Sequence, residues 1–152
     1  MNIAIDVSPL ENADLLSHRV RGTGFYIENL KKASLKYFPK NKYIFFTRGK
    51  KLSKNIDLVH YPYFEPFFLT LPRYRPYKTV VTVHDLTPFV FEKDFPVGIK
   101  GRIKWQIQKA SLKSVNAIIT DSESSKKDIV RFTGISEDKI SVVYLAAGEG
   151  FK

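Results

Sequence analysis

Cysteine is absent from the 152 residues, and no apolar run is long enough to cross a membrane. The first absence excludes disulfide bonds, thiolate zinc sites and cysteine nucleophiles. The second excludes a membrane-spanning helix, which needs about 18 apolar residues. The N-terminal NIAIDV is strand-like and has no basic segment before it, so no secretory signal is predicted. These absences are consistent with a cytoplasmic protein.

Several motifs of metal and nucleotide chemistry are also missing. There is no H-E-x-x-H pair and no D-x-D that would hold a nucleotide-bound divalent cation, so we predict no metal site. The segment Gly49-Lys50-Lys51 lacks the first glycine of a phosphate-binding P-loop, and no G-x-S-x-G marks a hydrolase. We expect no bound cofactor.

Acidic residues are few: 15 Asp and Glu face 25 Lys and Arg, which gives a formal net charge of +10. Hydrophobic residues make up 43% and charged residues 26%, a composition typical of a globular domain. The charge favours anionic partners, which include nucleic acid, anionic lipid and phosphorylated substrates. Charge by itself does not choose among them.

Strand-like and helical segments alternate along the chain. Short apolar or β-branched runs predict strands, and apolar residues at helical spacing predict helices. The strands are expected at 2–7, 43–47, 57–60, 79–83, 117–120 and 140–145, and the helices at 22–37, 98–115 and 123–132. Segment 61–77, rich in proline and aromatic residues, predicts an irregular stretch with one turn near 67–71. This alternation predicts an α/β fold with a parallel sheet and helices on both faces.

Polar residues stand at the expected carboxyl ends of several strands, where open α/β sheets bind ligands. His84 and Asp85 end the most hydrophobic strand, and Ser122 and Glu123 follow another. An imidazole at this position could bind a sugar hydroxyl or move a proton near neutral pH. The structural alternative is a histidine satisfied by backbone, with Asp85 capping a turn. His60 has the same placement and the same two interpretations.

The segment Gly22-Thr23-Gly24 is expected to open a helix, with Arg21 just before it. Glycines allow close approach of an anion to the backbone, a helix N-terminus favours negative charge, and arginine pairs with phosphate. The alternative is a flexible helix entry with a solvated arginine. A dinucleotide site is disfavoured because the third glycine of its fingerprint is missing and the loop before the segment is long.

Basic residues also decorate the helix expected at 98–115. Lys100, Arg102, Lys104 and Lys109 surround Trp105, and the preceding irregular segment carries aromatic residues, namely Phe64, Phe67 and Phe68. Such a surface could contact an anionic membrane or a lipid-linked acceptor. The alternative is that Trp105 packs on the sheet while the basic side chains are solvated.

Five segments, taken in order, resemble family 4 glycosyltransferases. They are IAIDVSPL, RVRGTGFYIENL, DLVHYPY, TVVTVHDLTPF and NAIITDSESSKKDIVRFTGISEDKISVVYLA. The most specific parts are VTVHDLTP and the block that runs from the strand through D-S-E-x-S-K-x-D and a helix to G-I. The resemblance is to the N-terminal, acceptor-side domain of the family, and it covers essentially the whole chain.

Family members fold as two Rossmann-like lobes, the GT-B arrangement, with the active site between them. The resemblance therefore implies that residues 1–145 form the N-terminal lobe, that 146–152 begin an interdomain linker and that the C-terminal donor-binding domain is absent. It also implies a retaining, metal-independent transfer from a nucleotide-sugar to a glycan or lipid-linked acceptor. The donor would be held mainly by the absent lobe, so the chain alone is expected to be inactive.

The resemblance also implies roles for individual residues. His84 matches the histidine that lies beside the transferred sugar, and Gly22 and Gly24 match the glycine loop near the donor diphosphate. Thr23 separates two glycines that are adjacent in the commoner form of this loop. Ser122 and Glu123 match the start of a helix that borders the cleft.

Two other function classes fit parts of the sequence. A basic nucleic-acid-binding α/β module would explain the net charge of +10 and the many aromatic residues. It would require basic and aromatic residues on one sheet face, whereas the predicted strands are buried. A nucleotide-dependent oxidoreductase is disfavoured by the incomplete glycine fingerprint.

Overall fold

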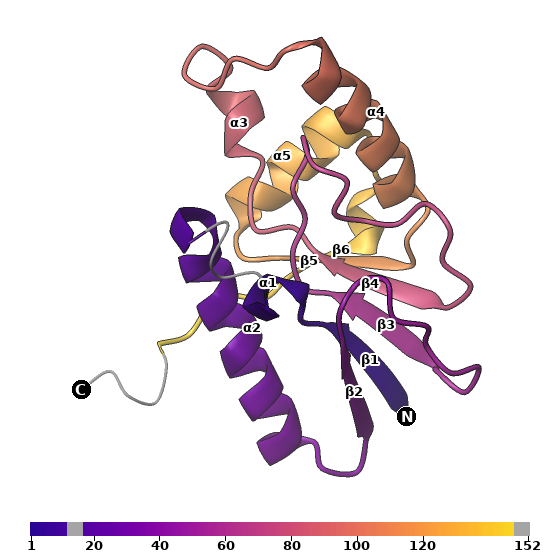
Figure 1. The fold of residues 1–152 in the computed structure, drawn as a ribbon. Coiled ribbons are helices and arrows are strands. Elements are labelled where there is room, and N and C mark those ends of the chain that lie inside the picture. Colours follow the sequence, from indigo (N-terminus) through magenta and orange to yellow (C-terminus); the bar gives the residue numbers. More distant parts are fainter. Residues whose placement is uncertain (12–16, 148–152) are drawn as a thin grey trace.

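The computed structural model describes residues 1–11 and 17–147, and side chains in the range 11–21 are left out of the description below. Six strands form one parallel sheet in the order β2-β1-β3-β4-β5-β6. The strands are β1 (Asn2–Asp6), β2 (Lys42–Phe46), β3 (Leu58–Tyr61), β4 (Lys78–Thr82), β5 (Ala117–Thr120) and β6 (Ile140–Val142). This confirms the predicted Rossmann-like α/β class (Figure 1).

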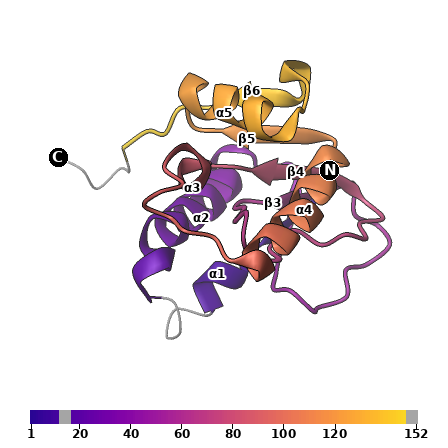
Figure 2. The same ribbon diagram turned by 90° about the horizontal axis from the view of Figure 1, so that it is seen from above.

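Three longer helices connect the strands, with shorter helical turns between them. The longer helices are α2 (Ser17–Tyr37), α4 (Ile99–Lys113) and α5 (Glu123–Thr133); the shorter ones are α1 (Ser8–Glu11), α3 (Thr87–Val90) and a 3-10 turn, η1 (Glu137–Lys139). Helix α2 lies on one side of strands β3 and β4 and α4 on the other (Figure 2). The sheet is therefore covered from both sides, as predicted for βαβ units.

Side chains alternate along each strand, so the register assigns every strand residue to one face. Ile5, His60 and Thr82 lie on the face that α2 covers. The opposite face carries Val59 and Val81, which belong to the main hydrophobic core. Functional side chains on one face of the sheet are thus separated by the sheet from those on the other face.

The main core lies between the sheet and the helices on the α4 side. Trp105 and Leu112 of α4 and Ile129 of α5 pack on the strands there, and all three side chains are buried. Burial of a side chain of this size contributes about 1.5–3 kcal/mol. Phe89 of α3 joins the two helices, with its ring centroid 4.4 Å from that of Trp105.

The irregular stretch between β3 and β4 replaces a crossover helix. Residues 62–77 contain no helix or strand, only a turn at 66–69, as the prolines predict. Gln108 of α4 holds this stretch, because its side-chain oxygen accepts from the backbone nitrogens of Thr70 (3.1 Å) and Leu71 (2.8 Å). The buried amide fixes an otherwise unpatterned loop against the sheet.

The local stop and start signals of α5 are confirmed. The Ser122 hydroxyl caps the helix by accepting from the Ser125 backbone nitrogen at 3.0 Å. Gly134 ends it with φ of 71°, a left-handed conformation that favours glycine. Two other predicted boundaries differ clearly: α2 begins at Ser17 rather than at residue 22, and β6 ends at Val142 rather than at residue 145.

No helix among the described residues is long and apolar enough to cross a membrane.

Candidate active site

A cavity of about 510 Å³ opens beside the carboxyl end of β4, on the side of α2. Gly22, Thr23 and Tyr26 line it from the helix, and His84 and Asp85 line it from the strand end. Phe64 and Phe95, from the loops that follow β3 and α3, complete part of the wall. The fold therefore brings together the glycine segment and the strand-end histidine, which are about sixty residues apart in sequence.

His84 is held by a carboxylate from the neighbouring strand. Its Nδ1 lies 2.7 Å from Oδ2 of Asp121, the residue that follows β5. Its Nε2 lies 3.2 Å from the backbone oxygen of Pro62. The carboxylate accepts a hydrogen bond from Nδ1–H and so fixes both the orientation of the ring and the nitrogen that carries this proton.

The same carboxylate depends on His84. The second oxygen of Asp121, Oδ1, is buried and has no hydrogen-bond partner among the described residues. A buried carboxylate oxygen without partners is costly. Removing the imidazole would therefore leave Asp121 poorly compensated, and the pair behaves as one unit.

A hydrogen-bonded chain lies behind the pair, on the face covered by α2. The Tyr26 ring meets the His84 ring edge-on at 4.8 Å, and its hydroxyl is 3.3 Å from Oγ1 of Thr82. Nε2 of His60 lies 2.9 Å from the same Thr82 oxygen. Burial, with a smaller contribution from His84, lowers the pKa of His60 to about 4, so His60 is neutral in the folded protein at pH 7. Burial also raises the pKa of Tyr26.

The glycine segment lies inside α2 and not at its beginning, which corrects the sequence prediction. Helix α2 starts at Ser17, so Gly22 and Gly24 follow its first turn. The unpaired amides of a helix N-terminus belong to the first turn, and the predicted helix-end anion site does not form at these glycines. Gly22 is exposed, with nothing within 4 Å of the position of a Cβ atom. The Arg21 side chain lies outside the described part of the structure.

One family model matches the chain. It is the model of Glycosyltransferase Family 4, and it matches residues 8–146. The match includes the glycine segment, His84 and Asp121, which the cavity and the ion pair bring together. The chain belongs to glycosyltransferase family 4. No curated protein sequence matches it.

In this family 4 domain, the three residues predicted to line the cleft behave differently. Asp85 lines the cavity and also accepts, through Oδ1, from the backbone nitrogen of Thr87 at 2.8 Å. Asp85 therefore caps the turn at the start of α3, as the alternative interpretation of this residue predicted. Ser122 and Glu123 are absent from the cavity wall because they form the cap and first residue of α5.

The predicted membrane surface of the family 4 domain needs correction. Trp105 is 8% exposed and Phe64 is 6% exposed, so neither can insert into a lipid surface. Phe67 packs partly against the core, with its ring 5.0 Å from that of Phe89. These rings fill the space between α4 and the irregular stretch, which has no helix to cover it.

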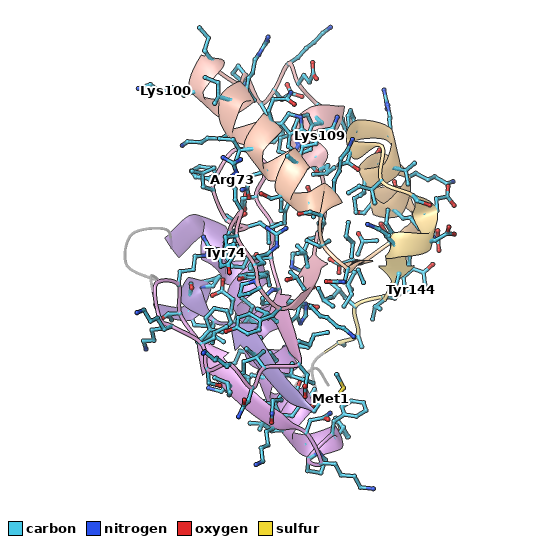
Figure 3. All side chains as sticks on the ribbon, turned by 90° about the vertical axis from the view of Figure 1, so that its right-hand side faces the viewer. Met1, Arg73, Tyr74, Lys100, Lys109 and Tyr144 are labelled. Carbon is cyan, nitrogen blue, oxygen red and sulfur yellow. The ribbon has the colours of Figure 1, made fainter. Side chains whose placement is uncertain are left out.

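The opposite side of α4 is exposed and amphipathic. Ile99 and Ile103 are 79% and 57% exposed, and Phe68 and Leu69 of the neighbouring loop are exposed as well. Among the predicted basic residues, Lys100 and Arg102 are exposed, and Lys104 lies 5.5 Å from the centre of the Phe68 ring. Lys109 lies 5.9 Å from the Trp105 ring centre. Lys100 and Lys109 project from the same helix (Figure 3).

Sequence reasoning noted Asp121 at a strand end without giving it a role, and it missed Tyr26. Asp121 directly follows a predicted strand, so its position at a strand end was a usable signal. Tyr26 carries no such signal, because its apolar ring at helical spacing predicts core packing only. Its contact with His84 depends on how α2 lies against β4.

Proposed function

We propose that the domain forms the N-terminal half of a retaining, metal-independent glycosyltransferase. The enzyme moves a sugar from a nucleotide-sugar to a glycan or a lipid-linked acceptor. Membership of family 4 supports the reaction class. In this proposal residues 1–145 are the acceptor-side lobe, 146–152 begin the linker, and a second lobe holds most of the donor. The chain alone is then inactive.

The His84–Asp121 pair beside the cavity carries the proposal. Asp121 holds the imidazole by Nδ1, which leaves Nε2 as the nitrogen that can address a ligand once it leaves the Pro62 carbonyl. With Nδ1–H given to Asp121, Nε2 accepts from a hydroxyl of the transferred sugar when the ring is neutral, and it donates to the developing negative charge when the ring carries a second proton. Because the imidazole is already oriented, the protein rearranges little as charge develops in the transition state.

Gly22 and Thr23 take the second role in the proposal. They face the same cavity as His84, and Gly22 presents bare backbone with open space above it. A diphosphate can approach the helix more closely there than at a residue with a side chain. Its charge would be met by close approach to α2 and not by free helix-end amides.

The proposal is tested by joining the domain to a donor-binding lobe of family 4. Transfer and hydrolysis of UDP-, GDP- and ADP-sugars are measured for the chain alone, for the fusion and for the fusion with His84→Ala. We expect background turnover for the chain alone, turnover for the fusion, and a loss of about 2–4 kcal/mol of transition-state stabilisation for the variant. Turnover by the chain alone, or full activity of the variant, contradicts the proposal.

We also propose peripheral contact of the domain with anionic membranes through the exposed side of α4. Ile99 and Ile103 with Phe68 and Leu69 provide the apolar part, and Lys100, Arg102 and Lys104 provide the charge. Each basic group near an anionic surface contributes about 1 kcal/mol. This surface would present a lipid-linked acceptor to the enzyme.

A further inference from the structure

A second cavity, of about 440 Å³, lies on the sheet face opposite to α2. Its floor is formed by Phe46, Val59, Tyr61 and Thr79, which belong to or border strands β2, β3 and β4. Its walls are the loop that follows β2 and residues 72–77. It shares no lining residue with the cavity at His84, so it is a separate site.

The charges around this cavity have one sign. Arg48, Lys50, Lys51 and Arg75 line it, and its lining includes no aspartate or glutamate. Asp6 partly neutralises the charge of Arg48, because Oδ2 of Asp6 lies 3.3 Å from Nε of Arg48. Lys50 and Lys51 are exposed and have no ion-pair partner among the described residues. The cavity is thus a local concentration of positive charge, which attracts anions.

Arg75 is a cation that the fold holds in place without a counter-ion among the described residues. It is half-buried, and it donates to the backbone oxygens of Pro72 and Ser111 and to the hydroxyl of Ser114. All of these acceptors are neutral. Burial lowers the pKa of Arg75 because the charged form is partly desolvated. An anion in the cavity would offset that cost, since buried charges are favourable only when they are paired.

Tyr61 supplies a second polar group. Only 7% of this residue is exposed, but its hydroxyl is not one of the buried atoms left without a partner and makes no hydrogen bond to the described residues, so the hydroxyl is open to the cavity that Tyr61 lines. Burial raises the pKa of this phenol and Asp6 raises it further, while Arg75 and Arg48 act in the opposite direction. A phenol that is buried among cations and lines a cavity is a hydrogen-bond donor available to an anion there.

The remaining walls are aromatic. The hydroxyl of Tyr77 donates to the backbone oxygens of Leu52 and Ser53, at 3.3 and 3.2 Å, so this ring is fixed. Tyr74 is 84% exposed and lies at the surface next to Arg73 (Figure 3). Exposed aromatic rings beside a cavity are typical of sites that hold an apolar or flat group.

From the two guanidinium groups, the unpartnered Tyr61 hydroxyl and the tyrosine walls, we infer a binding site for an organic phosphate. The phosphoryl group lies between Arg48, Arg75 and Tyr61, and the apolar or aromatic body of the ligand lies against Tyr74 and Tyr77. Arg48 donates to Asp6 and to the Leu69 carbonyl, and Arg75 donates to its three neutral acceptors, so both guanidinium groups act on the phosphate mainly through their positive charge. The inference does not depend on transferase activity.

Binding is measured by calorimetry on the chain with phenyl phosphate, inorganic phosphate and phenol, and by sedimentation with vesicles that contain phosphatidic acid. The first arm reports a free organic phosphate and the second a lipid phosphate. The pocket variants are K50Q/K51Q, Y61F and Y74A. The matched control is K54Q/R73Q, which removes the same charge from exposed residues outside the cavity lining.

We expect phenyl phosphate to bind at least tenfold more tightly than inorganic phosphate or phenol. K50Q/K51Q should weaken it tenfold or more, while the control leaves it within twofold. Because α4 is also proposed to bind anionic vesicles, this arm uses the chain with K100Q/R102Q/K104Q, and vesicle binding that is lost in the pocket variants and kept in the control supports the site with a lipid source. Equal losses in pocket and control variants, or no binding in either arm, overturn the inference. Y61F removes one oxygen only, so it tests the site without risk to the fold.

Discussion

At the scale of single residues, His60 shows how burial gives a side chain a measurable role. Its folded-state pKa of about 4 lies below the ordinary value of 6.5. The unfolded chain therefore binds more protons than the folded chain between these values. Stability that is fully present above pH 6.5 is lost as the pH falls towards 4.

We predict that this loss is about 2 kcal/mol between pH 6.5 and pH 5, since one pH unit corresponds to about 1.4 kcal/mol. His60→Gln retains a polar partner for Thr82 but cannot take up a proton, so its stability should change less over the same range. Urea unfolding at pH 7, 6 and 5 measures both proteins. Parallel pH profiles for the two would show that His60 does not titrate in this way.

The His84–Asp121 pair separates positioning from chemistry. In the full enzyme, Asp121→Asn keeps a polar group beside Nδ1 but removes the charge that holds it. We predict a fall in kcat of about tenfold or more with little change in KM, because the residue acts through His84 and does not touch substrate. Kinetics across pH 5–9 provide a readout that a purely structural role would not move.

The same pair predicts non-additive stability. His84→Ala should destabilise the chain by about 1–3 kcal/mol, because it leaves a buried carboxylate without its partner. Adding Asp121→Asn should restore part of that loss, since the amide carries no charge. Thermal unfolding of the two single variants and the double variant checks this. Strictly additive losses would contradict the coupling.

Two glycines should respond to alanine in opposite directions. Gly22 lies within α2 with open space around it, so Gly22→Ala should stabilise the chain by about 0.5–1 kcal/mol. Gly134 has φ of 71°, so Gly134→Ala should cost about 1–2 kcal/mol. Gly98→Ala, with φ of −72° and open space, is the control. If Gly22→Ala also lowers sugar transfer by the full enzyme while raising stability, the glycine serves the ligand.

At the scale of elements, α4 is a helix with two uses. Its inner side packs Trp105 and Leu112 on the sheet, and its outer side exposes Ile99 and Ile103 among basic groups. If the outer side of α4 faced only water, we would expect polar residues at these two positions. The exposed pair is therefore the observation that favours a membrane contact over simple packing.

We predict that the chain co-sediments with anionic vesicles at low salt and that most of the binding is lost at 1 M salt, where the Debye length falls to about 3 Å. K100Q/R102Q/K104Q should remove the salt-sensitive part, and Ile99→Ser with Ile103→Ser the remainder. The control K40Q/K42Q/K54Q removes the same charge from exposed sites elsewhere. Equal binding by all variants would exclude α4.

At the scale of the whole molecule, the sheet separates the two cavities. The cavity at His84 lies towards α2, and the basic cavity lies on the other face, between loops that take the place of crossover helices. Arg48, Lys50, Lys51 and Arg75 gather part of the positive charge at the second cavity. Two separate sites for anions are possible on one domain because opposite sheet faces do not communicate through side-chain contact.

Features that depend on near neighbours were predictable from the amino-acid sequence. Alternating strands and helices, the Ser122 cap and the Gly134 stop each follow from residues within one or two turns. His84 was identifiable because it directly ends an apolar strand. Such signals are local, so they survive without knowledge of the fold.

Contacts between residues that are distant in sequence are visible only in the folded structure. Asp121 lies 37 positions from His84, and the two pair because β4 and β5 are adjacent and in register. Trp105 faces inward because its ring fills the space beside Phe89 and the irregular stretch. Both cavities depend on how loops pack over the sheet. Contacts between distant segments follow from strand order and packing, which no short stretch of sequence encodes.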